Sequence, residues 1–137
     1  MPPIYLVPSR AAEYCAPAHL IAMLRTRFAP LVPALDERGG VVLRDAAGEL
    51  LCTLDVGNCP LLDPAFLDAE LVLAQQQQAT RRTIQLEQLR VLAPEPVVRI
   101  RYELRHAGEG DAVVRHLQNI FEAYLLDDAT FPDFMKK

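Results

Sequence analysis

The chain has 137 residues, of which 51% are hydrophobic and 23% are charged, and its formal net charge is −4. This composition is typical of a folded protein and excludes a disordered chain. No apolar run approaches the roughly 20 residues that a membrane-spanning helix needs. The first ten residues lack the basic and long apolar regions of a signal peptide, so we expect a cytoplasmic protein. The length predicts one domain over residues 1–137.

The charge is distributed unevenly along the chain. Residues 1–79 carry five arginines and nine acidic residues, whereas residues 80–105 carry six arginines and three glutamates. The negative total charge makes nucleic acid and anionic membranes poor partners. The local positive segment instead favours an acidic protein partner or a small anion.

The first part of the chain predicts a strand followed by a helix. Ile4–Val7 is short, apolar and flanked by prolines, which suits an edge strand. Pro17 is placed well for the first turn of a helix, and Pro30 ends the pattern. One helix face collects Leu20, Ile21, Leu24 and Phe28.

A β-hairpin is predicted next. Val41–Arg44 and Glu49–Val56 are strand-like and are joined by Asp-Ala-Ala-Gly. Asp45 at the start and Gly48 at the end fit a type I turn with a glycine bulge.

The middle of the chain is harder to assign. Asp63 is a good N-cap for a helix over Pro64–Ala79, with a short strand over Glu70–Ala74 as the alternative. In Arg82–Leu92 two pairs of apolar residues alternate out of phase, namely Ile84 with Leu86 and Leu89 with Val91. A strand with one bulge would reconcile the two pairs, and we favour it. The rival interpretation is one long helix over Pro64–Leu92.

The clearest pattern is Val97–His106, where apolar and charged residues alternate as in a strand with one buried face. Residues 108–110 are interpreted as a linker and Asp111 as the N-cap of an amphipathic helix. That helix has the apolar face Val113, Leu117, Ile120, Phe121 and Tyr124. Residues 127–137 form an acidic and then aromatic tail.

These elements predict an α+β fold: an antiparallel sheet of four to five strands with two to three helices packed mainly on one face. The first six elements follow the ferredoxin-like order; without the uncertain first strand the order is similar to small dimeric partner-binding folds, secretion chaperones included. The predicted core is Leu20, Ile21, Leu24, Phe28, Leu43, Leu50, Leu54, Ile100, Tyr102, Leu104, Leu117, Ile120, Phe121 and Tyr124.

The cysteines are the first place to look for chemistry. Cys15 and His19 are four residues apart, and Cys52 and Cys59 could complete four zinc ligands. However, structural zinc sites usually draw their ligands from tight pairs, and this spacing is loose. We therefore expect reduced thiols, with Cys52 buried in the hairpin, Cys59 in a loop and Cys15 partly exposed, and neither a metal nor another cofactor.

Other catalytic arrangements are weaker still. A cysteine nucleophile needs a histidine base, for which His106 and His116 are available, but no local signature surrounds any cysteine. Asp127, Asp128 and Asp133 suit a solvated tail better than a pair of catalytic carboxylates. Glycine-rich phosphate loops and the common hydrolase motifs are absent from the sequence. The chain is therefore more readily interpreted as a non-enzyme.

One charged surface remains as a functional candidate. On a strand, Arg99, Arg101 and Arg105 would project from one face, with about 6.5–7 Å between successive residues of that face. Arg82 and Arg90 would extend this face if they lay on a neighbouring strand. Such a surface can bind carboxylates through paired hydrogen bonds. The ordinary alternative is a solvated face balanced by nearby glutamates.

The tail offers a different surface, because Phe131, Phe134 and Met135 must either dock on the body or contact a second chain. We therefore expect a non-catalytic protein-binding module of the adaptor, chaperone or inhibitor type, with a homodimer as an open question. It would use the arginine face and this apolar tail. The alternative is a small-molecule-binding or enzymatic domain with a pocket between sheet and helices.

Overall fold

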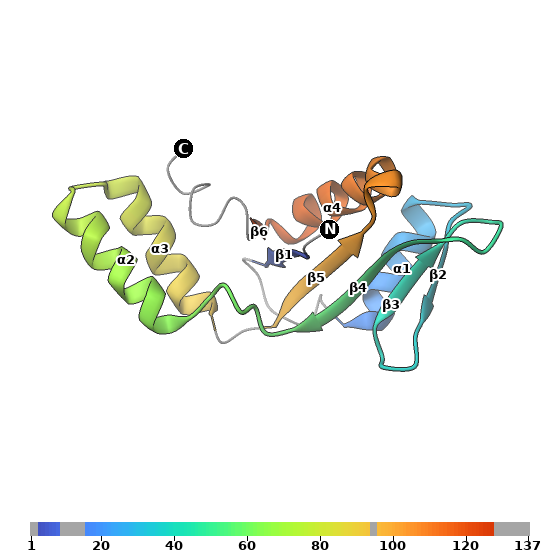
Figure 1. The fold of residues 1–137 in the computed structure, drawn as a ribbon, viewed down its shortest axis with the longest axis horizontal. Coiled ribbons are helices and arrows are strands. Elements are labelled where there is room, and N and C mark those ends of the chain that lie inside the picture. The colour runs from blue at the N-terminus through green and yellow to red at the C-terminus, as the bar shows by residue number, and fades with distance from the viewer. Residues whose placement is uncertain (1–2, 9–15, 94–95, 128–137) are drawn as a thin grey trace.

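The computed structural model describes residues 3–8, 16–93 and 96–127, and these ranges contain a single antiparallel sheet of six strands with four α-helices (Figure 1). The elements are β1 (Ile4–Val7), α1 (Pro17–Arg27), β2 (Val32–Leu35), β3 (Val41–Arg44), β4 (Leu50–Gly57), α2 (Pro64–Gln76), α3 (Thr80–Leu92), β5 (Val97–Tyr102), a short 3₁₀ helix (Leu104–His106), α4 (Ala107–Phe121) and β6 (Tyr124–Asp127). The α+β class is confirmed, whereas the predicted numbers of strands and helices are too low. Within these ranges no helix is long and apolar enough to cross a membrane.

The strands lie in the order β2-β3-β4-β5-β1-β6. The first strand of the chain is therefore an interior strand, since Ile4 is opposite Ile100 on one side and Asp127 on the other. The prediction that β1 is an edge strand is wrong, because the unpredicted strand β6 covers its outer side. The ferredoxin-like order is not found either, because α2 and α3, without a strand between them, separate β4 from β5.

The predicted β-hairpin is confirmed as β3 and β4. One carboxylate oxygen of Asp45 accepts hydrogen bonds from the backbone N–H groups of Ala47 and Glu49, each at 2.9 Å. Gly48 has φ of 89°, a left-handed conformation that glycine adopts without a steric penalty. The turn residues thus form the hairpin that their sequence predicts.

The segment between β4 and β5 is a helical hairpin. Asp63 is the N-cap of α2, because its side chain accepts a hydrogen bond from the N–H of Phe66 at 3.1 Å. The predicted strand over Arg82–Leu92 is wrong, since α3 occupies these residues. The prediction of a single long helix is wrong too. α2 ends at Gln76, and Gln78 has φ of 54°, a left-handed conformation that interrupts the helix.

The last third of the described chain differs from its prediction at the boundaries. β5 ends at Tyr102 rather than His106, and α4 begins at Ala107 rather than after Asp111. The predicted linker over residues 108–110 therefore lies inside the first turn of α4. Tyr124, predicted to belong to the preceding helix, begins β6.

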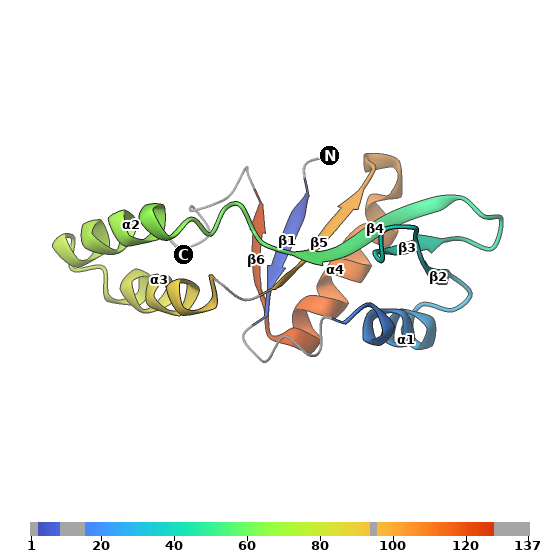
Figure 2. The same cartoon turned by 90° about the horizontal axis from the view of Figure 1, so that it is seen from below.

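Of the four helices, α1 and α4 pack on one face of the sheet, whereas α2 and α3 form a hairpin at the side of the sheet, beyond β6. Leu6 and Val98 belong to a core cluster with residues of α1 and α4. Their neighbours Tyr5 and Val97 belong to a second cluster with residues of α2 and α3. The helical hairpin extends beyond the β6 edge of the sheet and contacts side chains of the face opposite to α1 and α4 (Figure 2).

Most of the predicted core is buried or packs against the core. Three predicted members are instead exposed: Leu50 at 40%, Leu104 at 75% and Ile120 at 41%. Leu104 is exposed because the strand stops before it and the 3₁₀ helix turns its side chain outward. The predicted core residues that are buried are Leu20, Leu24, Leu43, Leu54, Ile100, Tyr102, Leu117 and Phe121.

Candidate functional site

The predicted arginine face does not form as one free cationic surface. Arg99 lies on β5 directly opposite Asp55 of β4. Its Nε and Nη2 donate to the two carboxylate oxygens at 2.8 and 2.7 Å, and these hydrogen bonds raise the pKa of Arg99. The forked contact that could have bound a partner's carboxylate is therefore made within the chain.

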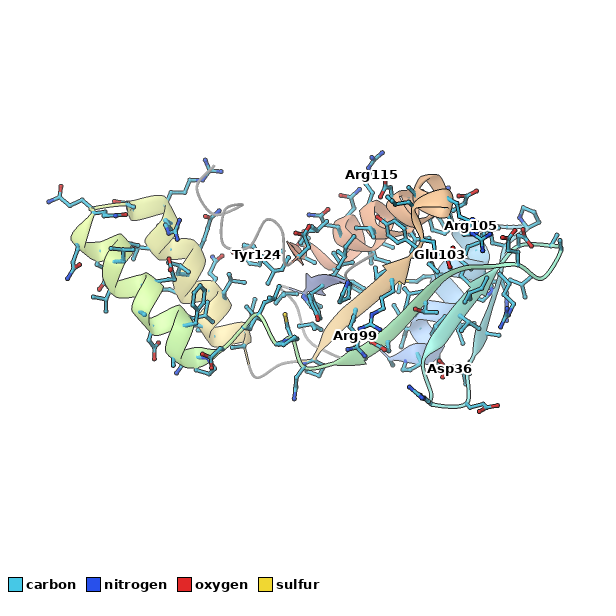
Figure 3. The ribbon with its side chains drawn as sticks, in the orientation of Figure 1. Asp36, Arg99, Glu103, Arg105, Arg115 and Tyr124 are labelled. Atoms are coloured by element: carbon cyan, nitrogen blue, oxygen red, sulfur yellow. The ribbon has the colours of Figure 1, made fainter. Side chains whose placement is uncertain are left out.

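Arg105 does not share a strand with Arg99, because it lies in the 3₁₀ helix beyond the end of β5 (Figure 3). Its Nε is 2.7 Å from a carboxylate oxygen of Glu103, and its Nη2 is 3.4 Å from Glu49. Within the described residues these contacts give Arg105 two acidic neighbours. It is therefore a locally balanced charge.

Arg101 is the member of the trio that keeps an available charge. It is exposed on β5, opposite Thr53, and no ion pair joins it to any residue in the described ranges. It lines a small cavity of about 190 Å³ at the ends of β4 and β5, together with Leu50 and Glu103. The arginine surface is thus reduced to one residue beside a shallow hollow.

The other two arginines proposed for this face lie elsewhere. Both are on α3, where Arg82 binds Glu70 at 2.5 Å and Arg90 binds Asp68 at 2.9 Å. Each pair joins α3 to α2, so these arginines hold the helical hairpin together. Phe131 and Phe134, the predicted apolar contacts of the tail, lie outside the described residues.

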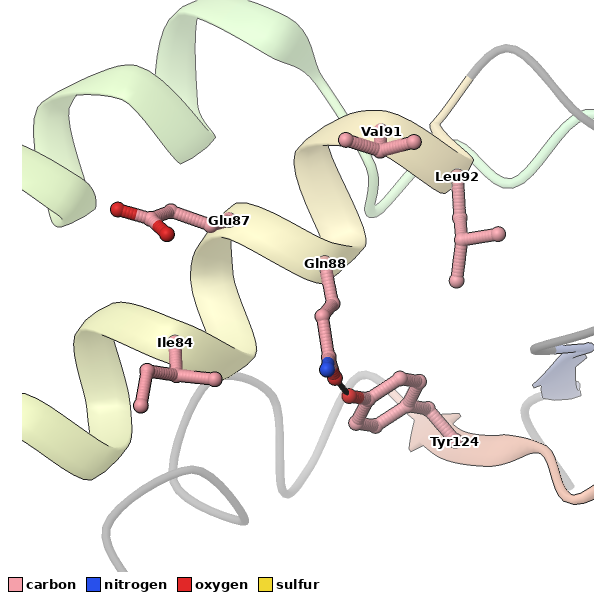
Figure 4. Close-up of a pocket in the computed structure, with 6 residues that line it drawn as sticks. All are labelled: Ile84, Glu87, Gln88, Val91, Leu92 and Tyr124. Atoms are coloured by element: carbon pink, nitrogen blue, oxygen red, sulfur yellow. Dashed lines mark hydrogen bonds between the residues drawn. The ribbon is translucent and has the colours of Figure 1, made fainter.

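A different site is a groove between α3 and β6, which we call the hairpin groove (Figure 4). Its volume is about 490 Å³, and its lining is mostly apolar. Ile84 is 51% exposed and Val91 is 75% exposed, which are high values for large apolar side chains. The lining residues are Ile84, Glu87, Gln88, Val91, Leu92 and Tyr124.

Two contacts hold the walls of the hairpin groove together. The hydroxyl group of Tyr124 donates a hydrogen bond to the side-chain oxygen of Gln88, so β6 is tied directly to α3. Beneath this bond, Leu126 is fully buried in the same cluster as Leu86 and Leu89 of α3. Burial also raises the pKa of Tyr124 above its ordinary value. The groove is therefore a fixed feature of the packing of α3 on β6.

The two cysteines of the described residues, Cys52 and Cys59, are both buried and lie apart from one another. Cys52 and Cys59 belong to the two different core clusters, and Cys15 lies outside the described residues. Burial raises the pKa of Cys52 to about 12, so its thiolate is not accessible at neutral pH. Within the described ranges no group of three or more His, Cys, Asp or Glu side chains could hold a metal.

Comparison of the chain with protein-family models, with curated proteins and with solved structures finds no match. The site must therefore be interpreted from its own residues. Sequence reasoning missed the hairpin groove, because it requires α3 and β6, neither of which it predicted. One signal was present: Ile84 and Val91 are seven residues apart, so on a helix they share a face, and this face is not the one that carries Leu86 and Leu89.

Proposed function

We propose that this protein is a non-catalytic protein-binding module whose hairpin groove receives apolar side chains of a partner. The observation that carries this proposal is the exposure of two large apolar residues, Ile84 and Val91, in the lining of this groove. Of the ten large apolar residues that are exposed in the described ranges, five lie on α2 or α3: Phe66, Val72, Leu73, Ile84 and Val91. Large exposed apolar patches commonly mark interaction sites.

The chemistry of the groove suggests what the partner presents. Ile84, Val91 and Leu92 provide apolar walls, while Glu87 and Gln88 place a carboxylate and an amide at the same surface. Such a site suits an aromatic or aliphatic anchor with polar or basic neighbours. Arg101, on the sheet, offers a separate contact for an acidic residue of the partner. The net charge of −4 makes a protein a better partner than a nucleic acid.

Affinity capture with matched variants tests the proposal. The tagged full chain is used to capture proteins from its native cell lysate, alongside Ile84→Asp and Val72→Asp. Ile84 and Val72 are exposed to similar extents, 51% and 53%, and both lie on the hairpin, but only Ile84 lines the groove. We expect a stoichiometric partner that Val72→Asp retains and Ile84→Asp loses. Equal capture by the two variants, or no stoichiometric partner, would overturn the proposal.

A second copy of this chain is one partner that the same variants can identify. Light scattering after size-exclusion chromatography gives the mass of each species in solution. A dimer that persists in Val72→Asp and dissociates in Ile84→Asp would make the partner a second copy bound through the groove. Melting curves of both variants ensure that a lost interaction is not a lost fold.

One observation favours the alternative of a small-molecule site. The groove volume of about 490 Å³ lies within the usual range of ligand pockets, roughly 300–1,000 Å³. A ligand that binds only the folded protein raises its melting temperature by mass action. A thermal-shift screen should then find compounds that stabilise the native chain and Val72→Asp but not Ile84→Asp.

A further inference from the structure

A cavity of about 460 Å³ lies between α1 and α4, the two helices that pack on the same face of the sheet (Figure 2). We call it the α1–α4 cavity. Its lining residues are Ala22, Met23, Thr26 and Arg27 of α1 and His116 of α4. Because residues three and four apart share a helix face, the α1 side chains form one continuous wall. The volume is within the usual range of ligand pockets, roughly 300–1,000 Å³.

The lining of the α1–α4 cavity contains a cation but no carboxylate. α1 has no acidic residue along its length, and Arg27 lies in its last turn. No ion pair joins Arg27 to another residue of the described ranges. By contrast, Glu87 lines the hairpin groove, and Glu103 lines the hollow at the ends of β4 and β5. The α1–α4 cavity therefore offers a positive charge that no carboxylate of its lining neutralises.

Two ring contacts hold the polar end of this cavity in place. The guanidinium carbon of Arg27 is 5.4 Å from the ring centre of Phe28, a distance at which an aromatic face attracts a cation. The ring of His116 meets the same phenylalanine edge-on, with the two ring centres 5.5 Å apart. Burial, followed by the charge of Arg27, lowers the pKa of His116, so its imidazole is neutral at pH 7 and can donate one hydrogen bond.

We propose that the α1–α4 cavity binds a small organic carboxylate, whose apolar body lies against Ala22 and Met23 and whose carboxylate group is held by Arg27. A guanidinium group binds a carboxylate through two parallel hydrogen bonds, and the imidazole of His116 supplies a further donor. The apolar wall favours a ligand with an apolar body over an inorganic anion, because only apolar surface gains from leaving water there. This site is separate from the hairpin groove and does not depend on the proposed function.

Isothermal titration calorimetry of the full chain tests the chemistry of the ligand. Octanoate joins a carboxylate to an apolar chain, octanamide keeps the chain without the charge, and inorganic phosphate keeps a charge without the chain. We expect octanoate to bind about tenfold more tightly than octanamide, because hydrogen bonds between charged groups are stronger than neutral ones. Phosphate should bind more weakly than octanoate. Equal affinity for octanamide, tighter binding of phosphate, or no binding of octanoate would overturn the proposal.

Matched arginine variants test the position of the carboxylate. Arg25 and Arg27 are both exposed in the last turn of α1, but Arg27 belongs to the cavity lining and Arg25 does not. Arg27→Gln should weaken octanoate binding about tenfold, whereas Arg25→Gln should change it by less than about twofold. Equal losses in the two variants would show a general effect of net charge and overturn the site. Melting curves of both variants establish that the fold is retained.

Proton NMR of the histidine rings locates the ligand without relying on a variant. His106 precedes His116 by ten residues, roughly 15 Å along the helix axis, and serves as an internal reference. Octanoate should shift the ring protons of His116 and leave those of His106 unchanged, and Ile84→Asp should retain this shift. A shift at His106 alone would overturn the proposal. Binding that is lost in Ile84→Asp but kept in Arg27→Gln would also overturn it, because the ligand would then lie in the hairpin groove.

Discussion

The ring of Tyr102, at the end of β5, lies against the backbone of Gly110 in the first turns of α4. A Cβ atom built on Gly110 would be 2.4 Å from Cγ of Tyr102, closer than any real contact. The glycine is therefore required by the packing of the sheet against the helix, although glycine is unfavourable inside helices. The close approach is reinforced by the Tyr102 hydroxyl group, which donates a hydrogen bond to Asp111.

Gly110→Ala should destabilise the protein by about 1–3 kcal/mol, because the added methyl group forces the ring or the helix to move. Gly108→Ala is the matched control, since nothing lies within 4 Å of a Cβ atom at that position. That variant should gain up to about 1 kcal/mol from the higher helix propensity of alanine. Urea unfolding measures both changes, and equal effects of the two substitutions would contradict this packing.

Tyr102 should ionise at a higher pH than an ordinary tyrosine, and its ionisation should lower the stability of the fold. Burial, followed by the hydrogen bond to Asp111, raises the pKa of Tyr102 to about 12 from an ordinary value of 10.0. The folded state thus favours the protonated phenol. This contribution to the free energy of unfolding is complete below pH 10 and is lost as the pH rises toward about 12.

Ultraviolet titration of the native chain and of Tyr102→Phe isolates this group. The difference between the two curves should show one phenol that ionises near pH 12, and the alkaline loss of stability should be smaller in Tyr102→Phe. A difference curve centred near pH 10 would mean that the phenol is not held as described.

The ion pair between Arg99 and Asp55 should contribute little to stability. The two side chains are 38% and 46% exposed, so water and salt screen their attraction. A double-mutant cycle with Arg99→Gln and Asp55→Asn should give a coupling energy of about 0.2–1 kcal/mol that falls in high salt. A coupling of several kcal/mol, insensitive to salt, would show that the pair is more strongly shielded from solvent than these exposures indicate.

Cys52 should resist alkylation in the folded protein. It is 2% exposed and has a pKa of about 12, so both access and thiolate formation are suppressed. After brief treatment with iodoacetamide at pH 8, mass spectrometry of proteolytic peptides should find Cys52 unmodified. The same treatment in urea should modify it fully, and rapid native labelling would contradict the burial of this thiol.

Two kinds of local pattern predicted the structure correctly. The alternation over Val97–Tyr102 reports a strand with one buried face, and the turn over Asp45–Gly48 is fixed by its own side-chain and glycine chemistry. Both depend on residues close together in the chain. The periodic face of α4 is similarly local, and Val113, Leu117 and Phe121 are buried as predicted.

The predictions are wrong where tertiary contacts, and not the local sequence, determine the secondary structure. Only Leu86 and Leu89 of α3 are buried, while Ile84 and Val91 are exposed, so the helical period is obscured by the residues that line the groove. The predicted start of α4 is wrong because Gly110 is not part of a linker. It is a glycine because the ring of Tyr102 packs against this turn of the helix and leaves no room for a Cβ atom. β6 has four residues and depends on pairing with β1, more than a hundred residues earlier, which no local pattern reports. The candidate site was missed for the same reason.

The interior position of β1 has a consequence for how the chain acquires its fold. β1 is made first, yet its partners β5 and β6 are separated from it by roughly a hundred residues of sequence. Contacts of such long sequence separation slow folding, because a large loop must close before they form. During synthesis the β2–β3–β4 meander can assemble on α1 before β5 and β6, the partners of β1, have been made. β5 and β6, which are synthesised after the other described strands, then pair with β1 on its two sides.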